Sequence, residues 1–420
     1  MKRFLFTGLL AIMVTGLFAQ KVEKAKELLK ANKLAEARTE IDAFLAQEKN
    51  AKNADGWYTK AKIYNAISMD ATLKAQVPEA RMEAFKSLKK YTEVDDKMLI
   101  ALQIDGYKPV NEIYTGYYQE AANSFNAKDY QTSLTGFKNA IEVSTFMTQK
   151  GWINLKLDTN SVLYAGVSAE KLNKPEEAVS YYGKLAEGKI KSDGFAEIYK
   201  WVANYYYEKK DMTNAEKFVG LGKEVYPGDP FWASLELDMS RDKGDKNTLF
   251  SKYEETIAAN PENHLYRYNY AVELYQYGYN TDSAKRPADS EEKIKKASES
   301  IQQALRIKPD YSRAQLFAGQ IVYNQGVDML TRSKAMKGTK PDEVKRKADL
   351  KAEAIKKFDE ATPFFLKVDE LLGGQGKLKM EDKTDLKEAY DLLITIYDQK
   401  GMKDKVKEFE VKFNDVDRKH

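Results

Sequence analysis

Beyond residue 20, apolar residues recur three and four positions apart through almost the whole chain, in stretches rich in Ala, Lys, Glu and Leu. This is the spacing of an α-helix with one apolar face. Only ten prolines and 23 glycines interrupt the pattern. No run of four or more alternating β-branched residues lies between turn signals, as a strand would require. The pattern therefore predicts an all-α protein.

The helical pattern repeats with a period that the prolines mark. Pro227 and Pro261 lie 34 residues apart, and Pro309 follows after 48 residues, which is the same period with 14 residues added. The added residues lie around 279–290, where Asn, Asp, Ser and Pro indicate a loop. Such a period predicts tandem helical hairpins, each of which buries its apolar face only by packing on its neighbours. Ten residues after the prolines, at the expected contact position of the next first helix, lie Leu237, Ala271 and Gly319.

The residues that recur at fixed offsets are small or aromatic. Trp57, Ala61 and Tyr64 show the first-helix spacing, and the other copies are Ala121 with Ser133, Phe137 and Ala140; Gly166 with Ala178 and Tyr182; and Ala203 and Tyr206 with Ala215. This pattern resembles the tetratricopeptide repeat (TPR) family. The resemblance implies a right-handed α-solenoid of about nine TPR-like helical hairpins. Their expected spans are 21–50, 54–95, 110–148, 159–190, 196–228, 230–260, 264–307, 312–372 and 384–415.

Three segments depart from the strict period. From Gly319 to Ala354 the chain has 35 residues where the family has about 12, so we expect an extended hairpin over 312–372. The final hairpin is degenerate, which is typical of a C-terminal cap over 384–420. Long connectors over 95–108 and 145–158 leave room for a separate N-terminal subdomain over 20–107, although we favour one continuous solenoid over 20–420.

The N-terminus has the pattern of a secretory signal peptide. Lys2 and Arg3 precede a largely apolar run over 4–18, and Ala19 suits the position before a cleavage site. We expect a signal peptide over 1–19 and no transmembrane segment in the mature chain. The chain contains no cysteine, which argues against lipid attachment and disulfides. The expected location is the periplasm, with secretion as the alternative.

Composition excludes several kinds of chemistry. Lysine and arginine number 68 and aspartate and glutamate 64, so loss of Lys2 and Arg3 leaves a net charge of +2, too small to indicate a nucleic-acid partner. The only histidines, His264 and His420, lack companions at metal-ligand spacing. The glycines over 373–376 follow no strand, so they predict a helix-ending turn and no phosphate loop. We therefore expect no metal, no cofactor, no catalytic residues and no enzymatic activity.

The remaining functional signal is the 27 tyrosines. Most of them belong in the core, but tyrosine on the inner wall formed by the first helices would offer a rigid contact surface with a polar end. Lys200 and Asn204 resemble the first pair of the family's carboxylate clamp, whereas Leu235 and Leu265 stand where further polar residues would complete it. The expected groove residues are Tyr58, Tyr118, Lys200, Asn204, Tyr207, Asp238, Arg241, Tyr268, Tyr275, Arg313, Gln320 and Tyr323.

Two functions suit such a wall. The first is a scaffold that holds partner proteins, or extended segments of them, in a concave groove. The second is glycan binding in an outer-membrane polysaccharide-uptake system, as in exported proteins that resemble the starch-utilisation family. Those proteins are normally lipid-anchored, and the missing cysteine weakens the likeness.

Overall fold

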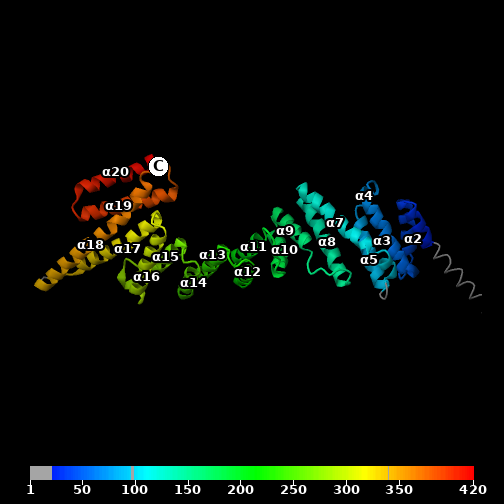
Figure 1. The fold of residues 1–420 in the computed structure, drawn as a ribbon, viewed down its shortest axis with the longest axis horizontal. Coiled ribbons are helices and arrows are strands. Elements are labelled where there is room, and N and C mark those ends of the chain that lie inside the picture. Colours follow the sequence, from blue (N-terminus) through cyan, green and yellow to red (C-terminus); the bar gives the residue numbers. More distant parts are fainter. Residues whose placement is uncertain (1–20, 96–98, 339) are drawn as a thin grey trace, which may run out of the picture. The chain divides into compact units, whose positions relative to one another are not determined.

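The computed structural model describes residues 21–95, 99–338 and 340–420, and these residues form helices joined by turns, with no strand among them (Figure 1). The predicted signal peptide over 1–19 lies outside the described residues. The chain divides into two compact units, one that ends at Leu235 and one that begins at Glu236. The boundary lies within α13 (Pro230–Asp242). The predicted all-α class is confirmed.

In the first unit, consecutive helices pack in pairs. A helical segment over 21–30 precedes α2 (Leu34–Leu45), and the next pair is α3 (Ala54–Met69) with α5 (Ala80–Val94), joined through the short α4 (Leu73–Gln76). The short α6 (Ile100–Ile104) leads into the remaining pairs. These are α7 (Lys108–Asn126) with α8 (Tyr130–Gln149), α9 (Thr159–Lys171) with α10 (Pro175–Glu187), and α11 (Ala196–Glu208) with α12 (Met212–Val225).

The second unit continues the pairing from the end of α13. Its helices are α14 (Lys246–Ala259), α15 (His264–Gly278), α16 (Ser290–Ile307), α17 (Ser312–Ala335), α18 (Pro341–Leu372), α19 (Met380–Gln399) and α20 (Lys403–Lys419). Within the described residues, every predicted hairpin span corresponds to one helix pair. The fold is therefore an α-solenoid of TPR-like hairpins, and the repeat predicted from the proline spacing is confirmed.

Several hairpin turns share one local design. Lys128, Asn173 and Lys210 each adopt a left-handed conformation, with φ of 62°, 55° and 60°, just after the first helix of a pair. In two of these turns the next residue is an aspartate, Asp129 or Asp211, whose carboxylate accepts a backbone N–H in the first turn of the second helix. Such capping satisfies donors that a helix start leaves open, so Asp129 and Asp211 fix where the second helix begins in these two hairpins.

The small residues identified in the sequence lie where paired helices approach closely. A Cβ built on Gly166 would lie 2.5 Å from the ring of Tyr182, and one on Gly319 would lie 2.5 Å from the ring of Phe365. Ala271 has no exposed surface. A larger side chain at these positions would have to displace an aromatic ring of the partner helix.

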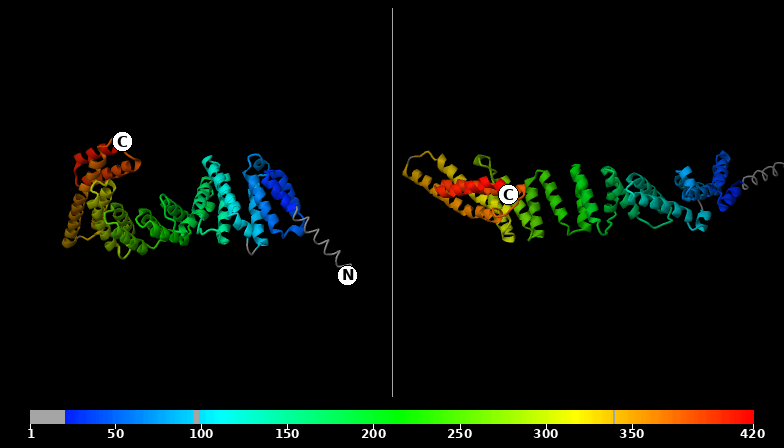
Figure 2. Two further views of the ribbon diagram at one scale, coloured as in Figure 1. Left: turned by 45° about the vertical axis from the view of Figure 1, so that its right-hand side comes forward. Right: turned by 90° about the horizontal axis from the view of Figure 1, so that it is seen from above.

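The longest described hairpin is α17 with α18, at 24 and 32 residues. Both views of Figure 2 show the two helices running along each other (yellow to orange). Gly319 and Gly326 of α17 contact Phe365 and Phe358 of α18, so the tight packing extends over two further turns. No helix of the described residues has an apolar stretch long enough to cross a lipid bilayer.

Candidate functional site

Two of the tyrosines predicted to face a groove are buried. Tyr58 is 4% exposed; its hydroxyl donates to Asp105 at 2.7 Å and its ring lies 4.8 Å from that of Tyr91. Tyr275 is 8% exposed, and its hydroxyl accepts a hydrogen bond from Asn324 at 3.0 Å. The expected exposure was wrong because other parts of the chain cover both rings. Tyr58 packs against the second helix of its own hairpin and the connector that follows, and Tyr275 packs against the next hairpin. Burying an aromatic side chain in this way contributes strongly to packing.

Other predicted groove residues link one hairpin to the next. The Lys200 ammonium on α11 pairs with Asp229 at 2.7 Å, just before α13. On α17, the Arg313 guanidinium pairs with Asp385 at 3.2 Å. Gln320 donates to Glu388 at 2.6 Å. These polar groups already have partners within the protein, so their first role is to hold adjacent first helices together.

The remaining predicted residues lie at the surface in part. Asn204 donates to Glu208 one turn along α11 at 2.7 Å. Tyr268 packs edge-on against Tyr311 at 5.2 Å, and burial raises the pKa of its hydroxyl to about 12. The others are half-buried: Tyr118 edge-on against Phe137, Tyr323 against Phe358, and Tyr207 beside the Lys210 ammonium. Whether any of them binds a ligand stays a prediction.

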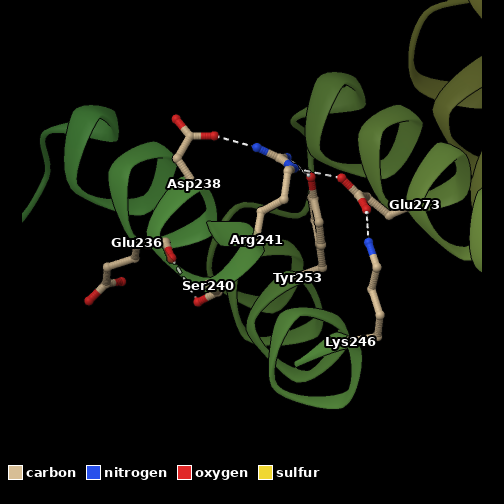
Figure 3. Close-up of polar contacts among 7 residues, drawn as sticks. All are labelled: Glu236, Asp238, Ser240, Arg241, Lys246, Tyr253 and Glu273. Atoms are coloured by element: carbon tan, nitrogen blue, oxygen red, sulfur yellow. Dashed lines mark hydrogen bonds and ion pairs between the residues drawn. The ribbon is translucent and has the colours of Figure 1, made fainter. Parts of the chain in front are cut away.

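Asp238 and Arg241, the last two predicted residues, belong to an ion network that joins α13, α14 and α15 (Figure 3). The Arg241 guanidinium donates to Glu273 at 2.7 Å, to Asp238 at 2.5 Å and to the Tyr253 hydroxyl at 3.0 Å. The Lys246 ammonium reaches the second carboxylate oxygen of Glu273 at 3.1 Å. Because Glu273 is buried, its carboxylate depends on these two cations for stability.

Removing the charge of Glu273 tests this network. Burial alone would raise the pKa of Glu273, but the hydrogen bonds from Arg241 and Lys246 outweigh it and hold the pKa below its usual value. We expect Glu273→Gln to lower the free energy of unfolding by about 1–2 kcal/mol at neutral pH. The loss is no larger because Arg241 is partly exposed, so water screens its attraction to Glu273. The carboxylate stabilises fully above its unfolded pKa of about 4.3, and this contribution is lost as the pH falls through the lower folded pKa.

Melting temperatures from circular dichroism measure the effect. Wild type and Glu273→Gln should differ at neutral pH and converge only as the pH falls through the lowered folded pKa of Glu273, below which the glutamate of the wild type is protonated as well. A difference that stays constant over this range would show that the charge of Glu273 does not matter.

A surface that the sequence analysis did not identify lies along α7. Asn111, Thr115, Gln119 and Asn123 follow each other at intervals of four residues and are all exposed. Residues four apart lie on one face of a helix. Within the part of the chain that the structure describes, none of these four side chains makes a hydrogen bond or ion pair to another residue. We call these four residues the α7 row; they offer amide and hydroxyl groups over about 18 Å.

A second set at the same interval ties α7 to the preceding hairpin. Glu112 accepts a hydrogen bond from Asn65 of α3 at 2.7 Å. Gly116 lies against the Arg81 side chain of α5 so closely that a Cβ would overlap the guanidinium. Glu120 pairs with Lys74 of α4 at 2.9 Å. Neighbouring faces of α7 thus differ: one face packs on the preceding hairpin, and the face that carries the α7 row remains available to bind a ligand.

The α7 row borders a concave cavity of about 690 Å³ between α3, α5 and α7. Its lining combines all four residues of the row with Ser68, Met69, Arg81, Lys108, Glu112 and Glu120, among others. An adjoining cavity of about 320 Å³ extends the hollow along α3 past Asn65 and Lys62. Together these residues form an elongated polar groove, which we call the α3–α7 groove.

The sequence carried a signal for this groove, but an ambiguous one. A row of Asn, Thr and Gln at helical spacing looks the same whether it faces open solvent or a hollow beside another helix. The position of α3 and α5 distinguishes the two cases, and it depends on the connector over 95–108, where the repeat pattern is interrupted. Among the described residues, no three His, Cys, Asp or Glu side chains come together as a metal site would require.

Comparison with known proteins yields only solved structures of low similarity. No family model matches the chain, and no curated protein matches it. The C-terminal part of a TPR repeat-containing protein from Cytophaga hutchinsonii is 15% identical with a TM-score of 0.44, covering 72% of this chain and 96% of that one. A TPR repeats protein from Bacteroides fragilis is 16% identical with a TM-score of 0.31, covering 66% and 98%. YrrB, described as a TPR protein with an unusual peptide-binding site, is 15% identical with a TM-score of 0.31, covering 47% and 88%. The fold assignment therefore rests on the helix pairs themselves.

Proposed function

We propose that this chain is an exported, non-enzymatic scaffold that holds an extended segment of a partner protein in the α3–α7 groove. The observation that carries the proposal is the α7 row: four exposed amide and hydroxyl side chains in line, beside a hollow, without partners in the described structure. An extended peptide presents an N–H and a C=O at every residue and rises about 3.3 Å per residue. The length of the row suits five or six such residues.

Glycan binding is the alternative that the sequence left open. Sugar rings would gain most from aromatic side chains, which supply a large rigid contact surface. The described residues that line the cavity along the α7 row include no phenylalanine, tyrosine or tryptophan. The amide and hydroxyl groups spaced along one face of α7 instead match the repeating donors and acceptors of a polypeptide backbone. The groove therefore favours a protein segment.

Alanine substitutions in the α7 row test the function. Peptides selected from a random display library on the chain from residue 20 onward should bind wild type with an affinity that Asn111→Ala, Gln119→Ala and Asn123→Ala together reduce about tenfold or more. The melting temperature should not fall, because these side chains hold nothing else in place. Lys86→Ala, an exposed position on α5, is the matched control and should leave affinity unchanged. Equal binding by the triple variant and wild type would place the binding surface elsewhere.

The periplasm remains the proposed location, supported by the signal-peptide pattern over 1–19. Chain recovered from the cell-envelope fraction should begin at Gln20, as intact mass would show. A chain that retains Lys2 and Arg3 and stays in the cytoplasm would contradict export.

A further inference from the structure

A third cavity, of about 560 Å³, adjoins the α3–α7 groove where α3 ends and α5 begins. It shares Ser68, Lys74, Arg81, Glu120 and Asn123 with the lining of the 690 Å³ cavity. Of the residues that line this third cavity, only Lys74, Arg81 and Glu120 are charged, which leaves a net charge of +1. The rest of the wall combines the polar side chains of Ser68, Asn123, Ser124 and Thr132 with the apolar side chains of Ala71, Ala75, Val77 and Pro78. We call this hollow the Arg81 cavity.

The Arg81 guanidinium is held rigidly in the wall of this cavity. The residue is 7% exposed, and its Nη2 donates to the Ser68 carbonyl at the end of α3 at 3.3 Å. On its other side it lies against Gly116, where any side chain would occupy its space. The ring of Tyr117 lies 5.5 Å from the guanidinium carbon. Arginine is thus fixed here by the backbone of α7 and by the end of α3.

Two of the Arg81 nitrogens lack a proper acceptor. Among the described residues, neither Nε nor Nη1 has a hydrogen-bond partner, although both are buried. Nη1 does lie 3.0 Å from Glu120 Oε2 as an ion pair. A buried donor without an acceptor costs about 1–3 kcal/mol and more when it is charged, so an acceptor that reaches Nη1 once Glu120 moves aside would recover interaction energy there.

Glu120 occupies the position that an external carboxylate would take. One of its oxygens pairs with Lys74 at 2.9 Å and the other with Arg81, so a single carboxylate is shared by two cations. Its side chain is 41% exposed, and it can rotate into solvent without opening the core. A guanidinium binds a carboxylate most strongly through two parallel N–H bonds, and Glu120 does not supply these.

We infer that the Arg81 cavity is an anion subsite that receives an Asp or Glu carboxylate of the bound segment, which replaces Glu120 between Lys74 and Arg81. The inference rests on the proposed function and adds the chemistry of the partner: the segment in the α3–α7 groove carries an acidic residue at a fixed position. Asn123 belongs both to the α7 row and to the cavity wall, so a segment that lies along the row leads directly to Arg81.

The composition of selected peptides tests the subsite. A random display library is selected in parallel on wild type, Arg81→Met and Glu120→Gln, each as the chain from residue 20 onward. Wild type should enrich Asp or Glu at one fixed position, Arg81→Met should select peptides without that enrichment, and Glu120→Gln should bind the acidic peptides several-fold more tightly than wild type. Replacing the acidic residue of a selected peptide by Gln or Asn should weaken its binding to wild type about tenfold.

The outcomes separate the subsite from the proposed function. Peptides that need the α7 row but show no acidic preference on wild type and Glu120→Gln would overturn the subsite and leave the function standing. Failure to select any peptide that needs the row would overturn both. Since Arg81→Met can disturb packing, Glu120→Gln carries the test independently: unchanged affinity for acidic peptides contradicts the inference. Inorganic phosphate serves as the competing probe; if it raises the melting temperature of Glu120→Gln while no acidic peptide binds, the assignment to a partner's carboxylate is wrong.

Discussion

Replacement of Phe365 by alanine is expected to lower the free energy of unfolding by about 3–5 kcal/mol, the cost of emptying a fully buried aromatic position. Phe365 has no exposed surface; its ring covers Gly319 of α17, and it belongs to the apolar cluster that α18 shares with α19. Because glycine has no side chain to move into the cavity, the space left by the ring cannot be refilled from α17.

The adjacent residue provides the control. Leu366 is 38% exposed, so Leu366→Ala should cost less than about 1 kcal/mol, especially since alanine favours the helix. Unfolding of both variants in urea, followed by circular dichroism, measures the difference. Equal losses for the two substitutions would mean that the packing of α17 on α18 does not hold this hairpin together.

Gly222 and Gly220, two residues apart on α12, are expected to respond in opposite directions to the same substitution. A Cβ on Gly222 would overlap the ring of Trp232, which is 1% exposed, so Gly222→Ala should destabilise the first unit by about 1–3 kcal/mol. Gly220 has nothing within 4 Å of a built Cβ. Gly220→Ala should therefore stabilise by up to about 1 kcal/mol, the difference in helix propensity.

Both changes add one methyl group to the same helix, so both have a similar effect on helix propensity. The difference between the two variants therefore measures the effect on packing. Thermal unfolding of the two variants beside wild type gives the comparison. If Gly222→Ala were as stable as Gly220→Ala, Trp232 would not pack on α12 as described, and the close approach of consecutive hairpins would be in doubt at this point.

The repeat was predictable because its determinants are local. Gly166 with Tyr182 and Gly319 with Phe365 are small and aromatic partners on paired helices, and Pro227, Pro261 and Pro309 mark where three of the pairs end. The nine spans therefore matched the helix pairs. The extended hairpin over 312–372 was expected from the 35 residues between Gly319 and Ala354, but the family pattern does not say where its first helix ends and its second begins.

The candidate site was less predictable because it depends on which neighbour a side chain meets. Tyr58 and Tyr275 lie on the helix face expected to line the groove, yet both are covered. Tyr58 is covered by Tyr91 and Asp105, and Tyr275 by the next hairpin. The sequence around Arg241 is typical of a surface cation, but in the structure its guanidinium pairs with the carboxylate of Glu273, 32 residues later. Conversely, Asn111 and Gln119 look like ordinary solvated residues until α3 and α5 form a hollow beside them.

Photo-crosslinking from the α7 row in intact cells tests the central claim most directly. A photoreactive amino acid at position 119 should yield an adduct to one or a few proteins, identified by mass spectrometry, whereas the same group at position 86 on α5 should not. The crosslinked residue of the partner should lie in an extended segment. Adducts that consist of polysaccharide, or that form equally from both positions, would contradict a groove built to hold a protein segment.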